Sequence, residues 1–262
     1  DKTLAEQMTR TNTIYEIRYD FDLGGSLFNI PEGCTLKFIG GSVKNGTIVC
    51  SNTTIDGCVS CISNLIIQGV VVNNIKLSWV GVFGNNSENK TNFNSLVNYS
   101  SIIFEVDSDI TFSDGDVVLK NNVTIIGNGH IISFTCNDAS NALIILSDRC
   151  RLDNVKISSQ SENYAKPILL ADTEFNKVHT FWLSKIVISG KYNAEGIYNS
   201  IGLRISASNY KDNSQNYITG CFIRDLRIEF VKIGVEISCV NQNYSTADFA
   251  WLNEIHTSSM YI

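Results

Sequence analysis

The sequence predicts an all-β protein whose main part is a parallel β-helix, and two observations support this fold class. The first is the stretch at 30–57, IPEGCTLKFIGGSVKNGTIVCSNTTIDG, in which short apolar runs recur every seven to ten residues between Gly and Asn turn formers. Each run is too short for a helix and is rich in β-branched and aromatic residues. Three strands in about twenty residues correspond to one coil of a β-helix, in which coils stack at about 4.8 Å.

The second observation is a longer repeat in the C-terminal half of the chain. A polar–apolar–x–apolar frame starts at four positions that lie 31, 40 and 28 residues apart, namely Asn154, Lys185, Asp225 and Asn253. A second strand type, GLRIS and later GVEIS, recurs at a step of 32 residues. Two strand types that recur together favour stacked coils over a sandwich or a meander. The frame therefore predicts one internal ladder of isoleucines, formed by Ile157, Ile188, Ile228 and Ile255.

The N-terminal third of the chain is expected to form a small β-rich block. Residues 3–9 can form a short helix with Leu4 and Met8 on one face, and residues 13–22 alternate as an opening strand. The stretch described above follows, and two further apolar runs lie within 65–77. We therefore assign residues 1–78 to an N-terminal β-rich block.

The rest of the chain is divided by one break in the strand pattern. Residues 79–100 form a linker with an amphipathic helix, expected at 89–98, that would cover an otherwise open apolar end of the β-helix. Strands return over residues 101–262, which we assign to the parallel β-helix. Because Ile262 falls partway through a coil, this part is expected to be incomplete at its C-terminus.

Composition restricts the possible partners. The net charge of −6 provides no electrostatic footprint for nucleic acid. The sequence contains no run of about eighteen apolar residues, so we expect no insertion into a membrane. Most of the eight cysteines adjoin apolar runs and are expected to be small buried hydrophobes in a chain that needs no disulfides. The one CxxC pair, Cys58 and Cys61, has no second pair or nearby histidine, so we predict no metal and no cofactor.

Two motifs resemble a known family. The stretch at 14–49, IYEIRYDFDLGGSLFNIPEGCTLKFIGGSVKNGTIV, closely resembles the opening of pectate-lyase-superfamily β-helix proteins of gut Bacteroidales and their phages. Residues 79–96 lie where that superfamily has W-F-G-A-K-G-D-G-x-x-D-D-T-x-A-I. Trp79, Gly81 and Gly84 keep this frame, but NNSEN replaces the acidic turn. The resemblance implies a right-handed single-stranded β-helix, often trimeric, that serves in a phage tailspike or tail fibre or as a secreted polysaccharide-active protein.

Catalytic groups are less well indicated than the fold. Polygalacturonases of the superfamily carry N-T-D, D-D, G-H-G and R-I-K motifs, and this chain has none of them in order. The best carboxylates for a hydrolase are Asp225 and Glu229, which would point outward from one strand about 13 Å apart, too far for a glycosidase pair. Glu254 on a neighbouring coil would have to complete the site. Outward charges on a β-helix are more often solvated, which is the expectation here.

Two other polar features are expected to be structural. The aspartates at 107, 109, 114 and 116 resemble a calcium set in composition but lack the D-x-D-x-D-G spacing, so we expect solvated turns. His130 follows Gly127-Asn128-Gly129 in a partial echo of a polygalacturonase motif, and its place at the start of a strand favours a structural role.

Tyrosines in long polar loops are the strongest indication of a binding site. A tyrosine in an Asn/Ser-rich loop can stack on a sugar ring while its neighbours bond to hydroxyl groups. Packing of these rings against the wall of the helix is the equally weighted alternative. The predicted glycan-binding residues are Tyr192, Tyr198, Tyr210, Tyr217 and Tyr244.

These features lead to one functional hypothesis and two alternatives. We expect a phage tail spike or fibre protein of the virion that binds host cell-surface polysaccharide and contacts other tail proteins. The first alternative is a polysaccharide lyase or glycoside hydrolase, borne on the tail or secreted to the exterior or surface of a gut bacterium. The second is a structural tail connector. The absence of a complete catalytic constellation favours binding or structure over catalysis.

Exposed tryptophans indicate assembly. Trp182 lies beside Phe181, and Trp251 lies near Phe249, so both members of a pair cannot point into the core of one extended strand. Exposed tryptophans are often buried at subunit contacts. We therefore predict a homotrimer about the long axis with Trp182 or Trp251 at or near the interface.

Overall fold

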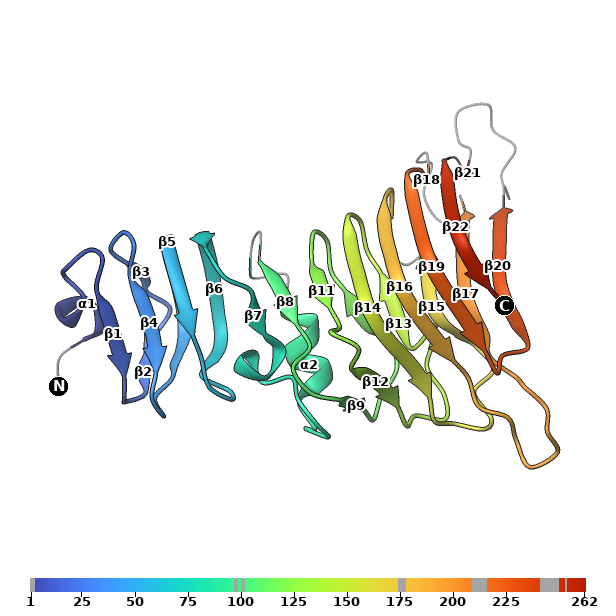
Figure 1. Cartoon of the computed structure of the whole chain (residues 1–262), viewed down its shortest axis with the longest axis horizontal. Helices are drawn as coiled ribbons and strands as arrows, with labels where there is room; N and C mark the ends of the chain where they lie inside the picture. Colours follow the sequence, from blue (N-terminus) through green and yellow to red (C-terminus); the bar gives the residue numbers. More distant parts are fainter. Residues whose placement is uncertain are drawn as a thin grey trace.

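The chain folds into an elongated stack of β-strands. The computed structural model describes residues 3–96, 99, 102–173, 178–208, 216–240, 250–252 and 254–262. The strands lie side by side like rungs along the long axis, with the two termini at opposite ends (Figure 1). Every pairing between the named strands of the described residues is parallel, as the sequence predicts. The prediction of an all-β protein is confirmed.

The N-terminal part is built around one long strand. Its elements are α1 (Leu4–Gln7), β1 (Ile14–Ile17), β2 (Phe21–Asp22), β3 (Leu27–Asn29), β4 (Thr35–Phe38), β5 (Val43–Asp56) and β6 (Ile62–Val71). Strand β5 pairs along its length with β2, β3 and β4 on one side and with β6 on the other. Thr3 and Glu6 form a capping box that starts α1, and Leu4 and Met8 are buried in the core at this end of the stack.

The helix predicted after the first block is present, but it does not cover an end of the stack as expected. The elements here are β7 (Ile75–Lys76), the 3-10 helix η1 (Leu77–Val80), α2 (Asn89–Asn94), β8 (Ile103–Glu105), β9 (Ile110–Phe112), β10 (Val117–Leu119), β11 (Thr124–Ile126) and β12 (Ile131–Phe134). Helix α2 contacts β9 and β10, and the ring of Phe93 meets Phe112 edge-on at 5.7 Å. It covers no end, because β7 pairs with β8 and the stack continues past it.

The C-terminal part consists mainly of two parallel sheets. Its elements are β13 (Ile144–Leu146), β14 (Cys150–Ser159), β15 (Pro167–Asp172), β16 (Phe181–Ser189), β17 (Ile201–Ser208), β18 (Asn216–Ile218), β19 (Cys221–Glu229), β20 (Ile233–Val240), β21 (Ala250–Leu252) and β22 (Ile255–Tyr261). One sheet has the order β10-β13-β15-β17-β20, and the other runs β22-β19-β16-β14-β11-β8-β7. A pair of short strands, β18 and β21, lies apart from both.

The predicted isoleucine ladder is confirmed at three positions and wrong at the fourth. Ile157 pairs with Ile188, and Ile188 pairs with Ile228, all of them buried. Ile255 instead pairs with Cys221, seven residues before Ile228. The frame of alternating residues was therefore aligned to the wrong part of the last strand, β22.

Two left-handed corners on the same strand explain this error. Asn154, Lys185 and Asp225 have φ of 53–54° where their strands bend. The register places Ser259, with φ 54°, at this corner of the last coil, because Arg224 pairs with Ser258. Glu254, with φ 53°, lies at an earlier corner opposite Gly220. Both corners consist of a polar residue followed by an apolar one, Ile255 at the first and Met260 at the second, so a short polar–apolar match does not tell them apart.

One large core runs through the described part of the stack, and a small second cluster of Ala142, Ile145 and Leu170 lies beside it. One cluster of buried apolar side chains extends from Leu4 to Ile228 without interruption. Five of the eight cysteines belong to it, as expected for small hydrophobes: Cys34, Cys50, Cys61, Cys150 and Cys221. Burial raises the pKa of the Cys61, Cys150 and Cys221 thiols to about 12. No helix in the described part of the chain has the length and apolar character to span a bilayer.

Candidate glycan-binding surface

Two of the predicted tyrosines come together on one loop. The 190–200 loop joins β16 to β17 and projects from the stack (Figure 1). Tyr192 and Tyr198 form an antiparallel bridge, and their rings meet edge-to-face at 6.2 Å. They are 56% and 37% exposed, respectively. Large aromatic groups in such an exposed position are suited to contacting a ligand.

Internal hydrogen bonds fix the shape of this loop. The side-chain oxygen of Asn193 accepts the backbone N–H groups of Glu195 and Ile197 at 3.0 and 2.9 Å. Gly196 has φ 77°, a conformation that favours glycine, and completes the turn. The two tyrosines are therefore held on a folded loop, and ordering it on binding would cost little.

Phe230 adds a third aromatic ring that sequence reasoning missed. Its centroid lies 6.2 Å from that of Tyr198, and the side chain is 49% exposed. Its φ of 58° is uncommon for a bulky residue, and such backbone strain concentrates at functional sites. The sequence signal was the aromatic residue directly after Glu229, where the strand frame ends. We refer to Tyr192, Tyr198 and Phe230 as the aromatic cluster.

The remaining predicted tyrosines do not join this cluster. The ring of Tyr217, on β18, stacks on His179 with centroids 4.6 Å apart. His179 lies just before β16, at the opposite end of that strand from the 190–200 loop. Tyr210 and Tyr244 lie outside the described residues.

A small cleft adjoins the aromatic cluster. The 190–200 loop leads into β17, whose Ile201 pairs with Pro167 and donates its N–H to the Lys166 carbonyl at 3.2 Å. The cleft has a volume of about 210 Å³ and is lined by Ser140, Asn141, Lys166, Pro167, Asp172 and Arg204, among others. Tyr198 precedes Ile201 by three residues, at most about 10 Å of chain, and Pro167 lies one inter-strand spacing of about 4.8 Å from Ile201, so the cluster and the cleft are near neighbours.

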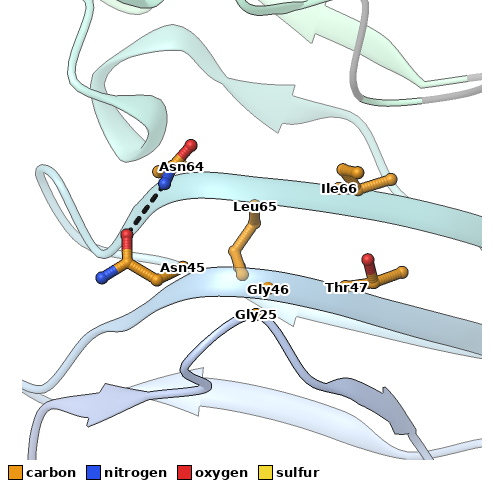
Figure 2. A pocket seen from close by; sticks show the side chains of 7 residues that line it. All are labelled: Gly25, Asn45, Gly46, Thr47, Asn64, Leu65 and Ile66. Atoms are coloured by element: carbon orange, nitrogen blue, oxygen red, sulfur yellow. Dashed lines mark hydrogen bonds between the residues drawn. The ribbon is translucent and has the colours of Figure 1, made fainter.

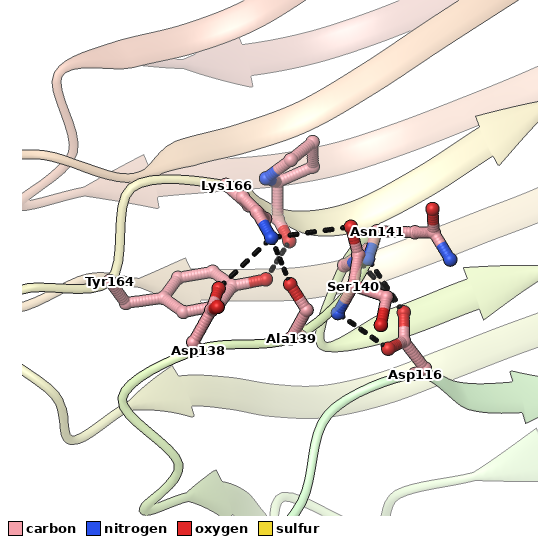
Figure 3. A network of polar contacts seen from close by, with 9 residues as sticks. Asp116, Asp138, Ala139, Ser140, Asn141, Tyr164 and Lys166 are labelled. Atoms are coloured by element: carbon pink, nitrogen blue, oxygen red, sulfur yellow. Dashed lines mark hydrogen bonds and ion pairs between the residues drawn. The ribbon is translucent and has the colours of Figure 1, made fainter.

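One wall of the cleft is held by a network of polar contacts (Figure 3). The Asp116 carboxylate accepts the backbone N–H groups of Ser140, Asn141 and Ala142 at 2.7, 2.8 and 3.2 Å. The Lys166 ammonium group bonds to the carbonyls of Ala139 and Ser140. The backbone of residues 139–142 is thus held in place through both its N–H groups and its carbonyl groups.

The same network keeps its carboxylates ionised. Burial acts to raise the pKa of Asp116, but the three backbone N–H groups outweigh it and leave the pKa below its usual value. Asp138 lies 2.9 Å from the Lys166 ammonium, and the hydrogen bond from Lys166 also lowers the pKa of Asp138. Both groups therefore carry negative charge at neutral pH.

Arg204 also lines the cleft, and it is paired with Glu236 on the next strand. The two side chains are on the neighbouring strands β17 and β20, and Arg204 Nη2 lies 3.0 Å from Glu236 Oε2. The side chains are 34% and 33% exposed, so their polar ends remain in reach of a ligand. Arg204 Nε is buried and has no hydrogen-bond partner, so the guanidinium has unused donor capacity.

The predicted carboxylates do not assemble into a catalytic pair. Leu226 and Ile228 point into the core as expected, but Asp225 is at a strand corner and pairs with Arg224 at 3.3 Å. Glu229 pairs with Arg227 at 3.0 Å. Glu254 lies opposite Gly220, five residues before Asp225, so the register does not bring it alongside.

The acidic residues at 107–116 take structural roles. Asp107 accepts the N–H and the hydroxyl of Ser78, and Asp109 accepts the N–H of Ile131. His130 lies 3.2 Å from Asp109 at the start of β12, in keeping with its expected structural role. Among the described residues no group of three or more His, Cys, Asp or Glu side chains is arranged to hold a metal ion.

An outward aromatic column is a second feature that the sequence did not reveal. Trp182, Phe222 and His256 occupy equivalent positions on β16, β19 and β22. Their rings are stacked nearly parallel, with centroids 5.9 and 5.0 Å apart. Stacking hides most of the ring faces, so this column offers a sugar mainly ring edges. The side chain of Trp251 lies outside the described residues.

A hollow near the N-terminal end lacks comparable chemistry. It is lined by Gly25, Asn45, Gly46, Thr47, Asn64, Leu65 and Ile66 (Figure 2). Asn64 Nδ2 donates to Asn45 Oδ1 at 2.9 Å, and Asn45 Nδ2 donates to Asp22 at 2.8 Å. No charged or aromatic side chain lines it, and its amides are bonded along the stack. We assign it a structural role.

Comparisons with protein families, with curated proteins and with solved structures find no match to this chain.

Proposed function

We propose that this chain is a right-handed single-stranded parallel β-helix that binds cell-surface polysaccharide. Parallel pairing between neighbouring strands within each sheet supports the β-helix. The pectate-lyase-superfamily motifs at 14–49 and 79–96 support its handedness by resemblance. The same resemblance leads us to propose a segment of a phage tail spike or fibre, located in the virion, trimeric and in contact with other tail proteins.

The observation that carries the binding proposal is the exposed aromatic cluster beside the cleft. Tyr192, Tyr198 and Phe230 supply apolar ring surface, and the cleft supplies rigid hydrogen-bonding groups. Sugar rings have apolar C–H faces and polar hydroxyl edges, so such a combination can contact both. An extended polymer can lie across the exposed corner without entering a deep pocket.

Binding is favoured over cleavage. A glycosidase needs an acid whose pKa is raised, together with a second carboxylate at a defined distance. Near the cleft the pKa values of Asp116 and Asp138 are lowered, and the predicted carboxylates Asp225 and Glu229 are each paired with an arginine. These four carboxylates therefore give no support to a glycosidase pair.

The proposal can be tested by measuring binding to a printed panel of neutral and acidic oligosaccharides. We expect Tyr198→Ala to weaken the affinity for the bound glycan at least about tenfold, which corresponds to about 1.4 kcal/mol. Tyr19→Ala is the matched control, because Tyr19 is an exposed tyrosine far from the cluster. Unchanged affinity in Tyr198→Ala, or no bound glycan, would contradict the proposal. Release of reducing ends or of products absorbing at 235 nm would show cleavage instead.

A further inference from the structure

We infer that the cleft beside the aromatic cluster receives a neutral, hydroxyl-rich sugar unit and not an acidic one. This inference rests on the proposed function, since it names the class of glycan that the same surface would bind. Three features carry it: the balance of charge around the cleft, the alternation of donors and acceptors on its walls, and the rigidity of those walls.

The described residues place ion pairs, and no unpaired cation, around the cleft. Its two cations, Lys166 and Arg204, are each already paired with a carboxylate, Asp138 at 2.9 Å and Glu236 at 3.0 Å. Asp172 also lines the cleft, and Asp116 lies behind the wall that it holds. A uronate or sialate would bring another negative charge beside these carboxylates and would meet cations that are already ion-paired.

The polar groups on the walls match hydroxyl groups instead. A sugar hydroxyl donates one hydrogen bond and can accept two, so neighbouring hydroxyls need donors and acceptors in alternation. The Arg204–Glu236 pair presents both kinds of group from adjacent strands. Ser140 and Asn141 add a hydroxyl and an amide to the lining of the cleft. Paired charges of this kind bond to neutral hydroxyls without leaving a net charge buried.

The size and rigidity of the cleft favour one sugar ring. Its volume of about 210 Å³ is below the roughly 300 Å³ at which pockets for drug-sized ligands begin. The floor of the cleft includes the buried apolar residues Pro167 and Leu170. The contacts from Asp116 and Lys166 hold the 139–142 segment in place before any ligand arrives, so little ordering is required on binding.

The first test uses the unmodified protein and the same glycan panel, read by affinity at different ionic strengths. We expect the bound glycans to be neutral, with dissociation constants that change less than twofold between about 50 and 500 mM NaCl, because an uncharged ligand is not subject to screening. Binding confined to uronate- or sialate-containing probes would overturn the inference.

The second test removes the donor groups of Arg204 while keeping its aliphatic stem. Arg204→Met is expected to weaken neutral-glycan binding about tenfold. Arg227→Met is the matched control, because Arg227 also pairs with a glutamate at 3.0 Å but is on the other sheet, away from the cleft. Equal affinities for the two variants, both with unchanged circular dichroism, would overturn the inference.

The two proposals fail in distinguishable ways. Acidic-glycan binding that is lost in Tyr198→Ala would leave the proposed function standing and reject only the neutral-sugar cleft. A panel without any bound glycan would reject both. Since the salt dependence is measured on the unmodified protein, the result does not depend on whether Arg204→Met folds.

Discussion

The N-terminal and C-terminal parts of the chain share an interior plan and differ at their corners and loops. Inside, Phe28, Ile48 and Ile67 form one ladder, just as Ile157, Ile188 and Ile228 form another. In the N-terminal part, one left-handed corner is occupied by asparagines that bond to each other, and a few residues connect the strands. In the C-terminal part, one such corner holds four different residue types in successive coils, and longer loops carry the aromatic cluster.

This difference separates the residues that stack the coils from those available for recognition. Interior positions of both parts must pack closely whatever the function. The loops between β15, β16 and β17 can change in length and composition without disturbing the ladders, because they lie outside them. The candidate binding surface is where such a loop meets a strand that carries charged groups on its outer face.

The largest effect on stability is expected from truncating buried side chains of the interior ladders. Ile48→Ala and Ile188→Ala each remove a fully buried side chain from a ladder, and we expect each to lower the free energy of unfolding by about 2–5 kcal/mol. Ile48→Val and Ile188→Val should cost about 0.5–1.5 kcal/mol. Chemical denaturation followed by circular dichroism measures both pairs.

A loss of stability in only one of the two alanine variants would contradict the shared interior plan, since it would mean that one ladder does not support the folded state. Two separate transitions, each affected by only one variant, would support the predicted division between residues 1–78 and 101–262. A single transition affected by both would indicate that the continuous core unfolds as one unit.

The asparagine corner offers a test of the N-terminal part alone. Asn45 has φ 57° and bonds to both Asp22 and Asn64, so Asn45→Ala loses two hydrogen bonds and places a Cβ in a disfavoured conformation. We expect a loss of about 2–3 kcal/mol, from about 1 for each hydrogen bond and about 1 for the backbone. Asn45→Gly keeps the backbone conformation accessible, so it should recover part of the loss. Equal stability of both variants and the original chain, by denaturant titration, would contradict this account.

The repeated left-handed corners also show how far sequence reasoning reaches. The polar–apolar frame identified three coils in register, because Asn154, Lys185 and Asp225 occupy the same corner. It failed at the last coil, where Glu254 and Ser259 occupy two corners five residues apart and a short polar–apolar match does not tell them apart. Periodicity finds corners, but only pairing between distant strands decides which corner is which.

The candidate site shows the same limit. Tyr192 and Tyr198 were predicted because both lie in one polar loop, where sequence proximity implies spatial proximity. The contribution of Phe230 depends on its left-handed backbone, which turns the chain after β19. The cleft brings together residues near positions 140, 166 and 204, and no local pattern connects them. Their meeting depends on the register of β13, β15 and β17.

Acid stability should depend on the network that holds the cleft wall. The folded-state pKa of Asp116 is lowered, so its contribution to stability is fully present above its unfolded value near 4 and is lost as pH falls through the lower folded value. Asp116→Asn should therefore be less stable than the original chain at neutral pH, with a smaller further loss below about pH 4. Asp114→Asn is the control, because that carboxylate accepts the hydroxyl of the adjacent Ser113 and makes no hydrogen bond to the 139–142 wall among the described residues. Parallel stability–pH curves for all three proteins would contradict the assignment.

The smallest expected effect is a gain in stability from a substitution at Lys185, one of the left-handed corners of the C-terminal part. Lys185 is exposed and has φ 54°, a conformation that costs most residues about 1–2 kcal/mol but that asparagine adopts readily. Lys185→Asn should therefore raise the free energy of unfolding by about 0.5–1 kcal/mol, measured by denaturant titration. Lys156→Asn is the matched control, because Lys156 is within the same type of strand at a position without positive φ. A gain in Lys156→Asn of the same size, or a loss in Lys185→Asn, would mean that the corner conformation does not limit stability. The expected result would show that the asparagine of the N-terminal corner can be transferred to the C-terminal one, and that the varied residues there are not required to close the coil.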